Sequence, residues 1–158
     1  MNTKRQQGFS LIELLIVVAI IGIIAAIAIP NLIASRRAAN EGAAKANMRT
    51  VTSAQATYQA TAGSGQFGTA AELQSAGLVD TILFAAAGKS GYSFATTPTA
   101  SSTTAAATYT STASTQSPSG VTATGTHNFF SSEAGVIYQG APSASAMTQG
   151  STSTPIGN

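Results

Sequence analysis

The sequence predicts an α+β fold in which a long N-terminal α-helix packs on a small antiparallel β-sheet head. Residues 9–35 are almost entirely apolar, and residues 36–62 remain compatible with a helix. Within 36–62, apolar side chains recur at helical spacing, as a helix face that packs on a core requires. Residues 63–140 contain short alternating stretches separated by Gly-containing turns, which indicate strands.

The apolar run 9–35 is long enough to cross a membrane. As a helix it extends about 40 Å, whereas the hydrocarbon core of a bilayer is about 30 Å thick. Its only charged residue is Glu13, four residues after Phe9. An unpaired carboxylate in hydrocarbon costs roughly 2–3 kcal/mol or more, so Glu13 is a candidate functional residue that needs a cationic partner.

Gly22 and Pro30 are the two weak points of this helix. Proline lacks a backbone donor and clashes with the preceding turn, and glycine has a low helix propensity. We therefore expect a kink at these residues, or local melting just before Pro30.

Two ordinary interpretations of the N-terminus explain only part of it. A cleaved secretory signal peptide has a shorter apolar region, and a small-residue cleavage site separates it from the domain that follows. Here the apolar region is long, no such site ends it cleanly, and helix-compatible sequence continues after Pro30. A plain signal anchor explains Lys4 and Arg5 as residues held on the cytoplasmic side. It does not explain Glu13.

The segment GFSLIELLIVVAIIGIIAAIAIP, residues 8–30, resembles the N-terminal signature of the type IV pilin family, which includes the pseudopilins of type II secretion. The resemblance implies that residues 1–8 are a leader of the short, type IVa-like kind. It implies that a prepilin peptidase cuts between Gly8 and Phe9 and N-methylates Phe9. It also implies that Glu13 pairs with the N-terminal amine of a neighbouring subunit during assembly.

Elementary electrostatics agrees with these implied roles. Cleavage removes Lys4 and Arg5 and creates a positive amine on Phe9, one helical turn from Glu13. A carboxylate and an ammonium attract strongly in low dielectric, and either one left alone there is costly. Gly8 carries no side chain that would obstruct the cut.

The predicted head, 63–140, begins with a short helix. Thr69 and Glu72 have the spacing of a capping box, and Gly77 is a helix stop. The expected strands are 91–97, 104–112 and 126–131, and a turn at 132–135 leads into a strand at 136–138. The expected core comprises Ala44, Met48, Val51, Ala54, Tyr58, Ala62, Leu73, Leu78, Val79, Ile82, Leu83, Tyr92, Phe94, Phe129 and Phe130.

Residues 95–126 and the tail 141–158 are rich in Ser, Thr, Ala and Gly. Such a composition predicts surface loops or flexible segments. O-glycosylation of exposed hydroxyl groups is the alternative use of these residues.

The remaining polar residues do not predict catalysis, a cofactor, a metal site or a small-molecule substrate. The chain has no cysteine, and its only histidine, His127, has no carboxylate at ligand spacing. The acidic side chains of the head are too scattered along the sequence for a calcium loop. Glu41 and Lys45 have the spacing of an ion pair on one helix face. A basic cluster, Arg36, Arg37, Lys45 and Arg49, has three interpretations: a solvated face, contacts with neighbouring subunits, or DNA binding.

These observations predict a structural subunit of a type IV pilus-like filament rather than an enzyme. Its expected partners are copies of itself, the prepilin peptidase and the inner-membrane assembly platform with its motor, with surfaces or DNA as further candidates. The expected locations are the bacterial inner membrane for the precursor and the periplasm or cell surface for the filament, where it would serve adhesion, motility or attachment. The alternatives are a type II secretion pseudopilin and a minor pilin in DNA uptake.

Overall fold

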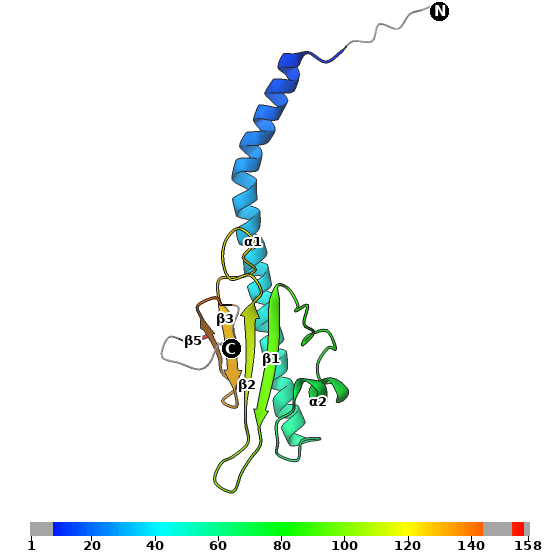
Figure 1. Cartoon of the computed structure of the whole chain (residues 1–158), viewed down its shortest axis with the longest axis vertical. Coiled ribbons are helices and arrows are strands. Elements are labelled where there is room, and N and C mark those ends of the chain that lie inside the picture. The colour runs from blue at the N-terminus through cyan, green and yellow to red at the C-terminus, as the bar shows by residue number, and fades with distance from the viewer. Residues whose placement is uncertain (1–7, 144–152, 157–158) are drawn as a thin grey trace, which may run out of the picture. The chain divides into compact units, whose positions relative to one another are not determined.

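A computed structural model describes residues 8–143 and 153–156 of the protein (Figure 1). The chain divides into two compact units, an N-terminal unit that ends at Ser35 and a C-terminal unit that begins at Arg36. One long helix, α1 (Leu11–Ala60), contributes to both, and a short helix, α2 (Ala70–Ser75), belongs to the second. The C-terminal unit also contains five strands.

Helix α1 is unbroken through Gly22 and Pro30. The expectation of local melting before Pro30 is therefore wrong, because the chain keeps its helical assignment there. The kink that the sequence predicts at these two residues stays a prediction.

The five strands form one antiparallel sheet in sequence order. They are β1 (Tyr92–Thr99), β2 (Thr108–Thr115), β3 (Asn128–Ser132), β4 (Ile137–Gly140) and β5 (Thr154–Ile156). The register places Phe94 opposite Ala113 and Ala113 opposite Phe129, so these side chains share one face of the sheet. An α+β arrangement of a long helix on a small antiparallel sheet is thus confirmed.

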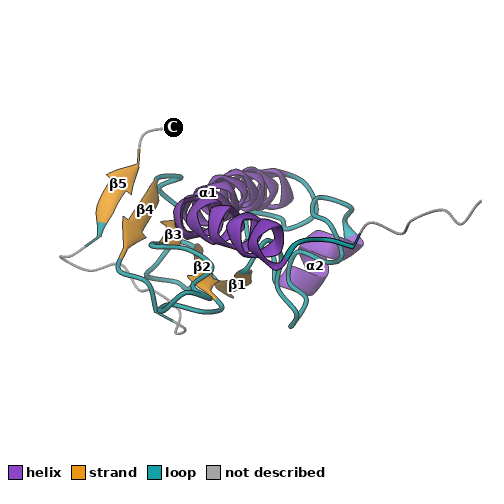
Figure 2. Ribbon diagram, turned by 90° about the horizontal axis from the view of Figure 1, so that it is seen from above, coloured by secondary structure: helices purple, strands orange, loops and turns teal. Residues whose placement is uncertain are grey.

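The C-terminal part of α1 lies along this sheet, and α2 lies beside the β1 edge (Figure 2). Because residues three and four apart share a helix face, Ala44, Met48 and Val51 turn inward together, and all three are buried. They form one core with apolar residues of the strands and of the α2 region. Its other buried members are Ala54, Leu73, Val79, Leu83, Tyr92, Phe94, Ala113, Phe129 and Ile137.

The capping box that the sequence predicts at α2 is present. The Thr69 hydroxyl accepts a hydrogen bond from the Glu72 amide, and the Glu72 carboxylate accepts one from the Thr69 amide. The helix ends before Gly77, whose φ of 69° is a left-handed conformation that glycine adopts without strain.

Five sequence expectations for this unit were wrong in detail. Residues 95–126, expected to form surface loops or flexible segments, contain the end of β1 and the whole of β2, most of which is buried. Ile82 is 55% exposed rather than part of the core. Ala62 is exposed and follows the end of α1. Strand β2, Thr108–Thr115, begins four residues later than expected. Strand β5 pairs with β4 inside the tail for which no packed structure was expected; residues 144–152, 157 and 158 of that tail lie outside the described residues.

Gln55 joins three parts of the C-terminal unit, and nothing in the sequence pattern singles it out. It is fully buried on α1. Its amide nitrogen donates to Gly68 O at 2.7 Å and to Thr96 Oγ1 at 2.9 Å, and its amide oxygen accepts from Gly68 N at 2.9 Å. One side chain thus satisfies the backbone of the loop before α2 and a hydroxyl of β1.

We predict that Gln55→Leu lowers the free energy of unfolding by about 2–4 kcal/mol, because it leaves several buried polar groups without partners. Urea unfolding of the detergent-solubilised full chain measures this. Gln59→Leu is the matched control, since Gln59 makes one long hydrogen bond at the exposed surface. Equal destabilisation by the two variants would contradict the role given to Gln55.

Candidate processing and assembly segment

The first turn of α1 contains Glu13, and its carboxylate caps the helix. Glu13 Oε2 accepts a hydrogen bond from the Ser10 amide at 3.0 Å, and the Leu14 amide donates to Ser10 O at 3.3 Å. Ser10 is therefore the residue before the helix, and Glu13 is the third helical residue. The first amides of a helix lack partners within it, and a carboxylate at this position also interacts favourably with the helix dipole.

Sequence analysis missed this intrachain contact, although Ser10-x-x-Glu13 has the capping-box spacing. The sequence predicts for Glu13 only a partner amine on another chain. The two roles are compatible, because a carboxylate has two oxygens and about four acceptor sites.

The bond between Gly8 and Phe9 lies just before the helix, in an open stretch of chain. Among the described residues, and apart from its neighbour in the chain, no group lies within 4 Å of the position that a Cβ on Gly8 would occupy, and Phe9 is 85% exposed. A backbone that is neither helical nor covered by side chains can enter the cleft of an enzyme. The other residues of the predicted leader, 1–7, lie outside the described part of the chain.

Helix α1 presents large apolar side chains to its surroundings on every side over residues 11–32. Among the described residues it is the one helix long and apolar enough to span a membrane, by length and composition. A helix that is apolar all round is stable in lipid or inside an assembly, but not in water. This surface therefore needs a cover that its own unit does not supply.

The predicted basic cluster does not act as one patch. Arg37 donates through Nε to Ala123 O at 3.2 Å and through Nη2 to Gly120 O at 2.6 Å, so it anchors the β2–β3 connection. Lys45 lies 5.5 Å from the centroid of the Phe129 ring. Arg49 lines a groove beside the β3–β4 turn and has a partner of its own. Arg36 is exposed.

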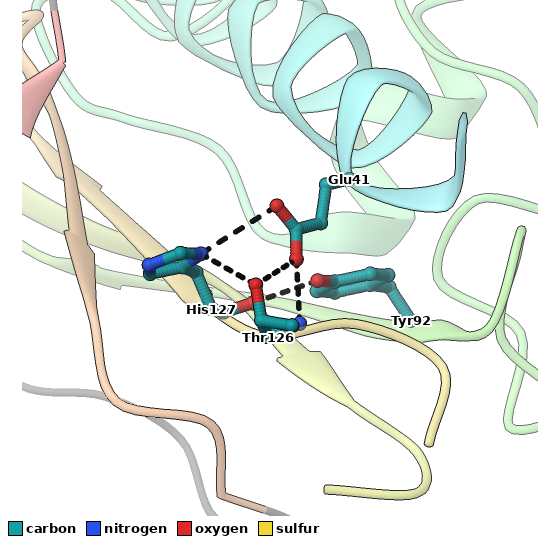
Figure 3. Close-up of polar contacts among 4 residues, drawn as sticks. All are labelled: Glu41, Tyr92, Thr126 and His127. Carbon is teal, nitrogen blue, oxygen red and sulfur yellow. Dashed lines mark hydrogen bonds and ion pairs between the residues drawn. The ribbon is translucent and has the colours of Figure 1, made fainter. Parts of the chain in front are cut away.

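Glu41 and His127 meet at the start of β3, together with Thr126 and Tyr92 (Figure 3). Glu41 Oε1 accepts hydrogen bonds from the amide and the hydroxyl of Thr126, and Oε2 lies 3.5 Å from His127 Nδ1. The Tyr92 hydroxyl donates to His127 O at 2.7 Å. Glu41 thus pairs across the fold with residues far along the chain, and the expected Glu41–Lys45 pair does not form.

Two features support this cluster. Asn40, the residue before Glu41 on α1, donates through Nδ2 to Thr124 O at 2.9 Å. A Cβ at Gly125 would lie 2.0 Å from the Tyr92 hydroxyl oxygen, so only glycine allows this close approach. Neighbouring residues of α1 therefore fix the β2–β3 connection to the helix.

The other acidic side chains are separately engaged. Asp80 forms an ion pair with Lys89 at 3.1 Å, and Glu72 caps α2. In residues 8–143 and 153–156, no group of three or more His, Asp or Glu side chains is arranged to hold a metal ion.

Residues 3–29 match the family model described as the prokaryotic N-terminal methylation motif. The chain is 52% identical over 54 residues to the type IV major pilin protein PilA of Myxococcus xanthus, covering 34% of this chain and 24% of that protein. It is 48% identical over 56 residues to the type IV wide pilus major component PilA4 of Thermus thermophilus, covering 35% and 43%. Over 28 residues it is 82% identical to a fimbrial protein of Pseudomonas aeruginosa, covering 18% of each.

The matches thus span less than half the length of these relatives. No solved structure matches the chain significantly. The names of these relatives describe pilus or fimbrial proteins.

We predict that the stability contributed by Glu41 depends on pH. Burial alone would raise the pKa of this carboxyl, but the hydrogen bonds from Thr126 and the neighbouring His127 outweigh burial and hold the pKa below 4.5. A lowered pKa in the folded state gives stability that is present above the pKa of the unfolded chain and is lost as the pH falls through the folded value.

Glu41→Gln is therefore expected to lower the free energy of unfolding by about 1–2 kcal/mol at pH 7, with a smaller difference from the original chain near pH 3. Urea unfolding of the full chain in detergent at both pH values measures this. Glu133→Gln is the matched control, because this exposed carboxylate makes no ion pair with another described residue. A Glu41→Gln effect that does not change with pH would contradict the prediction.

Proposed function

We propose that this chain, a type IV pilin family member by its N-terminal methylation motif and its α+β fold, is a structural subunit that polymerises into a filament. The observation that carries the proposal is the helix surface at residues 11–32, which is apolar on all sides and bears one carboxylate. A bilayer covers such a surface in the precursor, and the same helices of neighbouring copies cover it in the polymer.

Processing is the first step of the proposed function. A prepilin peptidase cuts after Gly8 and N-methylates the new terminus at Phe9. The open chain around Gly8 and the exposed Phe9 support this step. After the cut, five basic and five acidic side chains remain, since two of the seven basic residues belong to the leader.

Assembly is the second step. Before a copy docks, the Ser10 amide is the only hydrogen-bond partner of the Glu13 side chain among the described residues, and this bond leaves the negative charge uncompensated. The positive amine on Phe9 of an adjacent copy compensates it, and the carboxylate retains enough acceptor sites to keep the Ser10 contact. Because both charges lie in an apolar environment, a misplaced copy leaves two charges unpaired, which favours one register.

The two relatives from Myxococcus and Thermus are described as major pilus components. This supports a bulk subunit of a surface filament over a pseudopilin or a minor pilin in DNA uptake. The precursor is then held in the bacterial inner membrane, where the assembly platform and its motor extract it, and the filament serves adhesion, motility or surface attachment.

Gly8→Ala is predicted to accumulate unprocessed precursor in the membrane, because a side chain at this residue obstructs the cut. Mass spectrometry of membrane fractions detects the retained leader. A mature N-terminus at Phe9 in this variant, at the level of the original chain, would refute the role of Gly8.

Glu13→Ala is predicted to be processed normally but to lower the yield of sheared filaments by about tenfold or more, a factor that corresponds to roughly 1.4 kcal/mol. Glu13→Gln distinguishes the effect of the charge from the effect of the helix cap. The glutamine side chain is neutral, but its amide oxygen can still accept a hydrogen bond from the Ser10 amide. If charge pairing drives assembly, both variants assemble poorly. Normal filaments from Glu13→Gln would show that only the helix cap matters.

A further inference from the structure

Nearly every charged side chain in the C-terminal unit has a partner within the same chain. Glu41, Glu72 and Asp80 accept hydrogen bonds or ion pairs, Lys89 pairs with Asp80, and Arg37 binds backbone carbonyls. Lys45 lies over an aromatic ring, and Arg49 also has a partner. Among the described residues of the unit, two charged side chains of opposite sign have no such partner.

The two are Arg36, the first residue of the unit, and Glu133, in the turn between β3 and β4. Both are exposed, and neither forms an ion pair or a hydrogen bond with another described residue. The described part of the unit thus carries one cation and one anion without such a partner, at separate places on its surface.

The contacts between α1 and β3 show how far apart Arg36 and Glu133 lie along the helix. Thr126, just before β3, binds Glu41, whereas Ser131 Oγ in β3 lies 3.0 Å from Thr52 Oγ1. Strand β3 and helix α1 therefore run in the same direction (Figure 1). The two contacts are about 16 Å apart whether this distance is measured along the helix or along the strand. Arg36 precedes Glu41 on α1, and Glu133 follows Ser131 at the other end of β3. Adding these two segments to the distance between the contacts puts Glu133 about 30 Å beyond Arg36 along the direction of α1.

The two charges also lie on different sides of the unit. At about 100° per residue, Arg36 points roughly 160° away from Thr52, the α1 residue that contacts β3. Glu133 follows β3 on the other side, beside a groove that α1 shares with Gly135 and Ile137. No rearrangement of one side chain brings the two together within a chain.

We propose that Arg36 of one copy pairs with Glu133 of another copy displaced by about 30 Å along the helix direction. The contact joins two different patches, so it is head-to-tail, and head-to-tail contacts that do not close produce open helical assemblies. One exposed ion pair is weak, but a filament repeats it at every subunit. This proposal rests on the proposed function and adds a contact that is independent of Glu13.

Cross-linking in assembled filaments tests the contact directly. The chain has no cysteine, so Arg36→Cys combined with Glu133→Cys introduces the only thiols. A short bismaleimide is expected to convert this double variant into a ladder of dimers, trimers and longer chains, whereas each single variant stays monomeric. The matched control joins Arg36→Cys to Thr103→Cys, in the exposed β1–β2 loop, and is expected to give no ladder.

The absence of a ladder in the double variant, or an equal ladder in the control, would overturn the proposal. Dimers from either single variant would also overturn it, because they indicate a symmetric contact. If the double cysteine variant does not assemble, exchange of the charges decides the question.

Arg36→Glu and Glu133→Arg are each expected to lower filament yield about threefold, and their combination to restore it. Threefold corresponds to roughly 0.7 kcal/mol. Normal yield from both single variants, or no recovery in the combination, would sink the pairing. Imaging of filaments from the original chain separates the two claims: if that chain forms none, the proposed function itself fails, whatever the variants do.

Discussion

The apolar surface of α1 between residues 11 and 32 is the constraint on which the rest of this protein depends. Burying one large apolar side chain contributes roughly 1.5–3 kcal/mol, and here many such side chains have no cover within their own unit. The helix therefore needs an apolar environment at every stage. In our proposal the bilayer supplies it first and neighbouring helices supply it later, so that moving a subunit from membrane to filament exchanges one apolar cover for another.

In the proposed filament, charge pairing selects the register of neighbouring helices, which apolar contacts alone would leave unspecified. Lipid tails and leucine side chains are nearly equivalent partners, so apolar burial cannot favour one register of helices over another. In our proposal Glu13 favours one register, because its carboxylate is the only charge in the apolar part of α1 and few positions of a neighbouring amine would pair with it. Its bond to the Ser10 amide fixes the side chain before any partner arrives. In the C-terminal unit the polar side chains act differently: Arg37, Asn40 and Glu41 hold the β2–β3 connection on the helix.

Local features of this fold could be predicted from the sequence, whereas its long-range contacts could not. The apolar run, the capping box at Thr69 and the strands around Phe94 and Phe129 follow from spacing alone, and the structure contains each of them. The partner of Glu41 is different, because it lies 85 residues along the chain and a nearer lysine satisfies the same local rule. Gln55 and β5 were missed for related reasons. A buried glutamine looks like any polar helical residue, and a three-residue strand containing Pro155 carries almost no strand signal.

The most direct test of the account is the N-terminus of this chain in sheared surface filaments, determined by mass spectrometry. The account predicts that filaments consist mainly of this chain, beginning at an N-methylated Phe9 and without residues 1–8. Filaments built from chains that retain the leader would contradict it, because the leader then occupies the site of the amine that Glu13 requires.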